Sequence, residues 1–153
     1  AAAWRLDVDA PREPELLAEL PGGVVAVRPA LDGSRVAVIG KAYPRQPSWA
    51  DNHLYVTGDT EPRRLGAELD RPVGNVTTGD LVVRGSGVSC EWLSEGEIVA
   101  QVGDEGRTIP YRFEVSTGEA TPLLTSDIVS NSLVVAVNRL AMIATDRGRP
   151  TEG

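Results

Sequence analysis

The chain has 153 residues and a net charge of −7, from 15 basic and 22 acidic side chains. This length is sufficient for one domain with a hydrophobic core. The net negative charge, together with the absence of a cluster of lysine or arginine, argues against a nucleic-acid partner. No apolar run approaches the roughly 18 residues of a membrane-spanning helix, so no membrane partner is expected.

Short apolar runs followed by polar turns begin at the N-terminus and occur three times. Trp4-Arg5-Leu6-Asp7-Val8 leads over a turn to Leu16-Leu17, and Leu54-Tyr55-Val56 leads to Leu65. Tyr111-Arg112-Phe113-Glu114-Val115 leads over Ser116-Thr117-Gly118 to Leu123-Leu124. The closing leucines at 17, 65 and 124 are 48 and 59 residues apart. This spacing suits repeated β-sheet blades joined by loops of variable length.

A second type of hairpin lies between these copies. Residues 24–39 read as two strands around an Asp32-Gly33 turn, a strong hairpin signal between alternating apolar residues. Residues 93–99 and 132–145 are its later counterparts. The chain therefore alternates an inner and an outer hairpin, and two hairpins make one four-stranded blade of a β-propeller.

The order of the hairpins predicts an all-β fold, a partial β-propeller of about three four-stranded antiparallel blades. The blade pieces are expected at 1–17, 24–65, 81–124 and 132–153. Propellers close with roughly four to eight blades. We therefore expect the chain to be a fragment of a propeller domain, or to assemble with the remaining blades or another polypeptide.

Several segments, in this order, resemble the propeller of the prolyl oligopeptidase family, especially its acylaminoacyl-peptidase and dipeptidyl-aminopeptidase-like branch. They are Asp32-Gly33-Ser34-Arg35-Val36-Ala37 and the segments 53–56, 61–65, 69–74, 102–107, 109–112, 144–146 and 149–152. The resemblance covers nearly the whole chain. The loop 40–52 is shorter than in that family, and Leu65-Gly66 replaces its usual Leu-Thr.

The resemblance implies a serine peptidase whose propeller is a lid that admits short peptides to a catalytic α/β-hydrolase domain. The nucleophile of such enzymes lies in a Gly-x-Ser-x-Gly elbow of the hydrolase domain. This chain has no such elbow, so the catalytic domain is absent and no catalytic residue is assigned. The function expected is substrate gating for a peptidase that acts on short peptides or acyl-aminoacyl peptides. Its expected partners are the hydrolase domain or the remaining propeller blades, and a short peptide substrate. The alternative is a non-enzymatic β-propeller that serves as a binding scaffold, because the fold alone does not choose a function.

The loop that joins an inner strand to an outer one contains Tyr43, Arg45 and Trp49. Loops on a rigid scaffold often carry binding, and these residue types are common in recognition. The three residues are therefore the candidates for contact with a substrate or partner. Equally, Tyr43 and Trp49 could pack against the neighbouring blade.

The remaining residues with titratable or charged side chains are expected to have structural roles. The single histidine, His53, is expected at the start of a strand, and the single cysteine, Cys90, is expected to be buried and inert. Arg63 and Arg64 fall on an outer strand. Acidic residues that match no calcium loop are expected in solvated turns: Asp7, Asp9, Asp104 and Glu105. No metal or cofactor is predicted, and one unpaired cysteine fits a cytoplasmic location.

Overall fold

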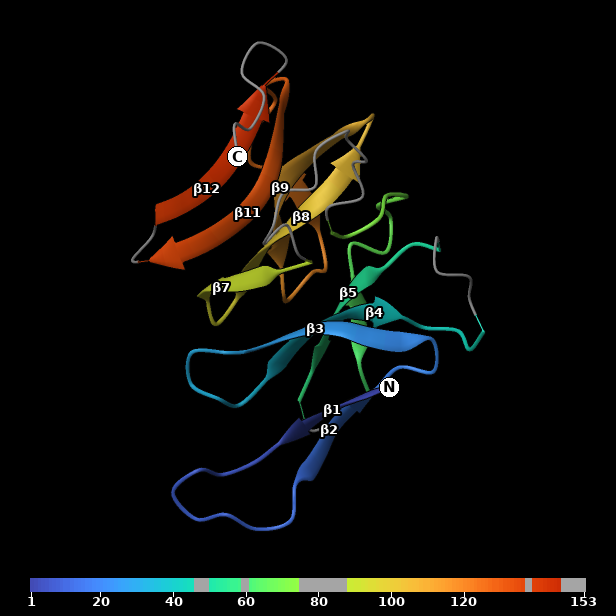
Figure 1. The fold of residues 1–153 in the computed structure, drawn as a ribbon, viewed down its shortest axis with the longest axis vertical. Coiled ribbons are helices and arrows are strands. Elements are labelled where there is room, and N and C mark those ends of the chain that lie inside the picture. The colour runs from blue at the N-terminus through green and yellow to red at the C-terminus, as the bar shows by residue number, and fades with distance from the viewer. Residues whose placement is uncertain (46–49, 59–60, 75–87, 137–138, 147–153) are drawn as a thin grey trace.

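The computed structural model describes residues 1–45, 50–58, 61–74, 88–136 and 139–146. These residues form twelve strands in four antiparallel sheets (Figure 1). The first six strands are β1 (Ala2–Arg5), β2 (Glu15–Glu19), β3 (Gly23–Pro29), β4 (Val36–Lys41), β5 (His53–Thr57) and β6 (Arg63–Leu65). The other six are β7 (Cys90–Ser94), β8 (Glu97–Asp104), β9 (Arg107–Glu114), β10 (Ala120–Pro122), β11 (Ile128–Ala136) and β12 (Arg139–Asp146).

Two sheets are complete blades in which sequence neighbours pair. One has the order β3-β4-β5-β6, and the other, read from its inner strand, has β7-β8-β9-β10. Two-stranded sheets flank them, β1-β2 on one side and β11-β12 on the other (Figure 1). The predicted all-β fold, a partial β-propeller, is confirmed, and the alternation of inner and outer hairpins holds for every described sheet. Residues 81–87, at the start of the third predicted blade piece, lie outside the described residues.

The first hairpin is shorter than its sequence pattern predicts. The strand expected over Trp4–Val8 runs instead from Ala2 to Arg5, and its last pair joins Arg5 to Glu15. The next residue on the opposite strand is Pro14, which has no backbone N–H to donate. Pairing therefore stops there, and Leu6 and Val8 lie in an exposed loop.

The last outer strand also ends before its predicted position. β10 closes at Pro122, so the Leu123-Leu124 pair lies beyond it. Leu123 still donates its N–H to the carbonyl of Pro110, at 2.9 Å. Since neither Pro122 nor Pro110 has an N–H, the ladder cannot continue in the same register.

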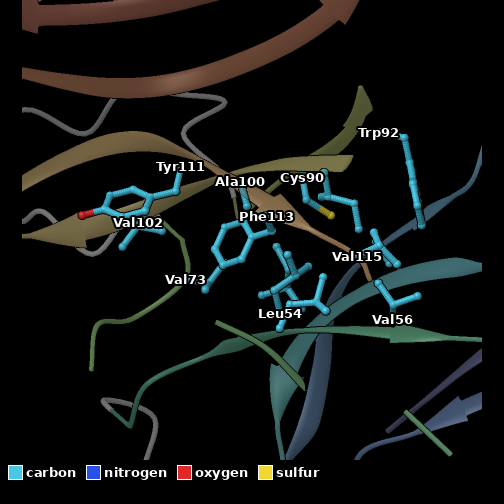
Figure 2. Packing of buried hydrophobic residues seen from close by; sticks show 14 of the residues in the cluster. Leu54, Val56, Val73, Cys90, Trp92, Ala100, Val102, Tyr111, Phe113 and Val115 are labelled. Atoms are coloured by element: carbon cyan, nitrogen blue, oxygen red, sulfur yellow. The ribbon is translucent and has the colours of Figure 1, made fainter. Parts of the chain in front are cut away.

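The main core lies between the two complete blades. Phe113 of β9 is 0% exposed and is the largest fully buried side chain described. Around it are Leu54 of β5, Val102 of β8 and Val73 of the linker between the blades (Figure 2). A smaller cluster joins Ala3 and neighbouring residues of the β1-β2 hairpin to β4 and β5. The described residues include no helix with the length and apolarity to span a membrane.

Candidate functional site

The candidate loop follows β4 and is exposed where the structure describes it. The side chain of Tyr43 is 70% exposed, so it does not plug against a neighbouring blade. Arg45 is also exposed and has a φ of 59°, a left-handed conformation that is uncommon for a residue with a side chain. Trp49 lies outside the described residues. The structure thus places Tyr43 and Arg45 together on the surface, and the recognition role of the loop stays a prediction.

The base of this loop is fixed against the connection between β2 and β3. The N–H of Gly22 donates to the carbonyl of Lys41, at 3.0 Å. A Cβ atom at position 22 would lie 2.3 Å from the carbonyl oxygen of Tyr43, so only glycine permits this close approach. The start of the loop is therefore rigidly positioned, although the side chains beyond it are exposed.

The linker between the two complete blades holds the β8–β9 turn beside the candidate loop. The N–H of Val73 donates to the carbonyl of Asn52 at 2.8 Å, and the N–H of Gly103 donates to the carbonyl of Pro72 at 3.0 Å. Asn52 precedes β5, and Gly103 lies near the end of β8. The β4–β5 loop and the β8–β9 turn therefore lie at the same end of their blades. We call this end the loop face.

An ion-pair cluster centred on Asp104 lies on the loop face. The carboxylate of Asp104 accepts hydrogen bonds from Nε of Arg71 at 2.9 Å and from the hydroxyl of Tyr111 at 3.2 Å. The guanidinium of Arg107 lies 3.9 Å away. The hydrogen bond from Arg71 is the main reason that the pKa of Asp104 is lowered. Burial, and then the charge of Asp104, raises the pKa of Tyr111.

This cluster corrects the sequence interpretation of Asp104 as a solvated turn residue. Its side chain is 18% exposed and is held by Arg71 and Tyr111, so it connects the linker between the blades to β9. The acidic residue was visible in the sequence, but its partner Arg71 lies 33 residues earlier, and no local pattern joins the two. The prediction of a turn is confirmed for Asp7, whose carboxylate accepts the N–H groups of Asp9 and Ala10 at 3.0 and 3.2 Å.

The histidine and the cysteine have the structural positions expected of them. His53 begins β5 and is half-buried, and burial followed by the charge of Arg64 lowers its pKa. Cys90 lies in the core, where burial raises the pKa of the thiol to about 12. Such a thiol stays protonated and is a poor nucleophile at neutral pH. Within the described ranges, no group of three or more His, Cys, Asp or Glu side chains is arranged to hold a metal ion.

At the other end of the blades, three arginines of the first complete blade and its turns donate to backbone carbonyls of the second complete blade and its turns. Nε of Arg28 donates to the carbonyl of Cys90 at 3.1 Å. Arg35 donates to the carbonyl of Glu95, and Arg63 donates to that of Val115. We call this contact the arginine seam. It confirms a structural role for Arg63.

Side chains of the second blade complete the arginine seam. The indole N–H of Trp92 donates to the carbonyl of Arg28 at 3.0 Å, and its ring lies 5.4 Å from the guanidinium carbon of Arg35. Glu91 forms an ion pair with Arg28 at 2.8 Å. Arginine suits such sites because its planar group carries several donors and stacks on aromatic rings. The seam predicts that the two complete blades move as one rigid body.

Arg64 follows Arg63 in β6 and lines a surface hollow of about 410 Å³ between the blades. The turns at Gly66–Leu69 and Thr117–Ala120 form its other walls. Two glutamates in these walls give the hollow a mixed charge. No feature of it indicates a particular ligand.

Comparisons with known proteins identify the fold class. No family model and no curated protein sequence matches the chain. Among solved structures, the β-propeller domain of the Trilobed protease from Pyrococcus furiosus, described as having an open velcro topology, is similar with a TM-score of 0.63 and 19% identity. The match covers 90% of this chain and 36% of that one.

A second solved structure, a putative TolB from Agrobacterium tumefaciens, has a TM-score of 0.34 and 12% identity, over 94% of this chain and 62% of that one. The first comparison establishes a β-propeller fold, and the present chain spans about a third of that solved chain. The sequence and the structure together define an open arc of propeller blades.

Proposed function

We propose that this chain is the non-catalytic propeller segment of a serine peptidase and acts as a lid that admits short peptides. The observation that supports this proposal most directly is the open arc of blades, whose fold is similar to a propeller domain of a protease. The catalytic α/β-hydrolase domain would come from another part of the same polypeptide or from a separate chain. The proposed location is the cytoplasm.

The role proposed for this chain is steric selection. The arginine seam and the shared core hold the two complete blades together, so they form a rigid wall that excludes folded substrates. Acyl transfer through a serine would be carried out by residues of the catalytic domain. Motion of the whole lid, rather than separation of these two blades, would then control access.

The exposed loop is the proposed recognition element. A guanidinium such as that of Arg45 can pair with a peptide carboxylate through two parallel hydrogen bonds. The Tyr43 side chain offers a large, mostly exposed ring beside it. These side chains would contact either the incoming peptide or the surface of the catalytic domain.

A fluorophosphonate probe tests this proposal, because it labels active serine hydrolases covalently. Material from the natural source is labelled, captured with an antibody to this chain, and examined by denaturing gel and intact mass. A labelled polypeptide that contains this sequence, or that is captured with it, is the expected result. Capture of the chain with no labelled species would reject the peptidase role and favour the binding scaffold.

A further inference from the structure

We propose that polar side chains of one blade close the inner edge of the next blade against strand addition, with Arg28 as the cap of β7 and Gln101 as the cap of β11. The inner strands β3, β7 and β11 follow one another along the arc, and each contacts the next (Figure 1). Among the described residues, each inner strand pairs on one side only, with the following strand of its own sheet. The other edge faces the axis of the propeller, where the blades surround a central channel. An open edge of this kind accepts a further strand from another chain.

The hairpin geometry of the second complete blade directs the carbonyl of Cys90 toward the inner edge. Both residues of the β8–β9 turn have a positive φ, as in a type I′ turn, so Asp104 and Arg107 on either side form a hydrogen-bonded pair. Such pairs recur at every second residue of an antiparallel ladder, so the pair of Ala100 and Tyr111 is also hydrogen-bonded. Cys90 lies opposite Ala100 on the other side of β8. The backbone groups of Cys90 therefore point away from β8, toward the free edge.

The linker between the complete blades supports this alternation independently. The N–H of Gly103 donates to the carbonyl of Pro72 at 3.0 Å, and the carbonyl of Gln101 accepts the N–H of Gly74 at 2.7 Å. Gln101 and Gly103 thus direct their backbone groups to the side of β8 that is opposite β9. Ala100, the neighbour of Gln101, must then direct its own groups toward β9.

The guanidinium of Arg28 covers the edge carbonyl of Cys90. Its Nε donates to this carbonyl at 3.1 Å, and Cys90 is only 1% exposed. An ion pair with Glu91 at 2.8 Å holds the guanidinium, and the indole N–H of Trp92 donates to the carbonyl of Arg28 at 3.0 Å. A strand that approached this edge of β7 would have to displace a charge-assisted hydrogen bond, which is stronger than a neutral one.

A similar contact recurs one blade farther along. The side-chain amide of Gln101, on β8, donates to the backbone carbonyl of Ser130 in β11 at 2.7 Å and to its hydroxyl at 3.1 Å. Both residues are 0% exposed. A buried carbonyl needs a hydrogen-bond partner, and here a side chain of the preceding blade supplies it in place of a further strand.

The inner strands carry other features that disfavour strand addition. Each has one residue more than its partner over the paired region, and the register passes over Val25 in β3, Leu93 in β7 and Asn131 in β11. Such bulges bend a strand and interrupt its edge. In addition, β3 ends at Pro29, which has no N–H to donate. The two caps thus belong to a set of features that closes the inner edges of all three described inner strands.

An extended peptide inside the proposed lid would meet these closed edges. It would find no continuous row of free backbone donors and acceptors on β7, so it would pass along the channel without joining a blade. This role in peptide passage rests on the proposed function, whereas the closure of the edges does not depend on it.

Removal of the β7 cap tests the proposal through self-association of the chain. Arg28→Met removes the donors and keeps a long unbranched side chain. Arg35→Met is the matched control, because Arg35 donates to the carbonyl of Glu95 in the β7–β8 turn, outside both strands. Assembly is followed by thioflavin T fluorescence, under conditions where urea denaturation shows the same folded fraction for each variant. Arg28→Met should assemble about five- to thirty-fold faster than Arg35→Met, the range expected for the loss of one hydrogen bond.

Two further variants separate edge closure from a general loss of stability. Arg28→Lys keeps a charged donor and should restore slow assembly. Gln101→Met tests the cap of β11 by itself and should also assemble faster than the unmodified chain, so a folding defect in one capping variant leaves the other informative. Equal assembly rates of Arg28→Met and Arg35→Met, failure of Arg28→Lys to slow assembly, or an unchanged rate for Gln101→Met would overturn the proposal.

Discussion

The contact between Gly66 and Phe113 predicts a strong dependence of stability on two small changes in the interblade core. Gly66 has a φ of 63°, and a Cβ atom added there would lie 2.9 Å from Cε1 of Phe113. Gly66→Ala therefore combines backbone strain of about 1–2 kcal/mol with an overpacking cost of about 1–3 kcal/mol. The expected loss in unfolding free energy is about 2–5 kcal/mol, measured by urea denaturation followed by circular dichroism.

A double-mutant cycle separates the two costs. Phe113→Leu removes the Cε1 atom and leaves a cavity in the core, at a cost of about 1–3 kcal/mol. In that background Gly66→Ala should cost only about 1–2 kcal/mol, so the two changes should be coupled by about 1–3 kcal/mol. Gly33→Ala is the matched control, because Gly33 has a φ of 73° and no atom within 4 Å of an added Cβ. Additive effects of Gly66→Ala and Phe113→Leu would refute the packing of the two blades described here.

Four further predictions concern charge, reactivity and recognition. The lowered pKa of Asp104 contributes stability above its ordinary value of 3.8, and this stability is lost as the pH falls through the folded-state pKa. Thermal unfolding between about pH 2 and pH 6 should show a smaller acid dependence for Asp104→Asn than for the unmodified chain. The single histidine, His53, should titrate below 6.5 in an NMR pH series, because the folded state disfavours its charged form. A value at or above 6.5 would contradict its partial burial. Cys90 should react with a thiol reagent in denaturant and remain unreactive in the folded chain, as measured by mass spectrometry. Arg45→Ala and Trp49→Ala should change peptide or partner selection without lowering the unfolding temperature, and a loss of folding would instead assign these residues to packing.

Local patterns in the sequence were sufficient to predict the hairpins. Asp32-Gly33 and Glu95-Gly96 stand between alternating apolar runs, and both form turns between paired strands. Strand ends were less predictable where proline interrupts the ladder. The positions of Pro14 and Pro110 become decisive only when the residues opposite them are known.

Contacts between blades could not be read from the sequence in the same way. The arginine seam joins residues about 50–60 positions apart, such as Arg63 and Val115, and depends on how one sheet stacks on the next. The Arg71–Asp104 pair likewise requires the blade linker to lie beside the β8–β9 turn. The exposure of the loop after β4 was predictable because its position between strands and its residue types are both local properties, and its recognition role stays a prediction.

Size selectivity is the most direct test of the proposed lid. The native polypeptide that contains this sequence is captured from its source and given either a short peptide or a folded protein that carries the same cleavage sequence in an exposed loop. The lid role predicts cleavage of the peptide and protection of the protein. Cleavage of both at similar rates would contradict steric selection, and cleavage of neither would contradict the peptidase itself.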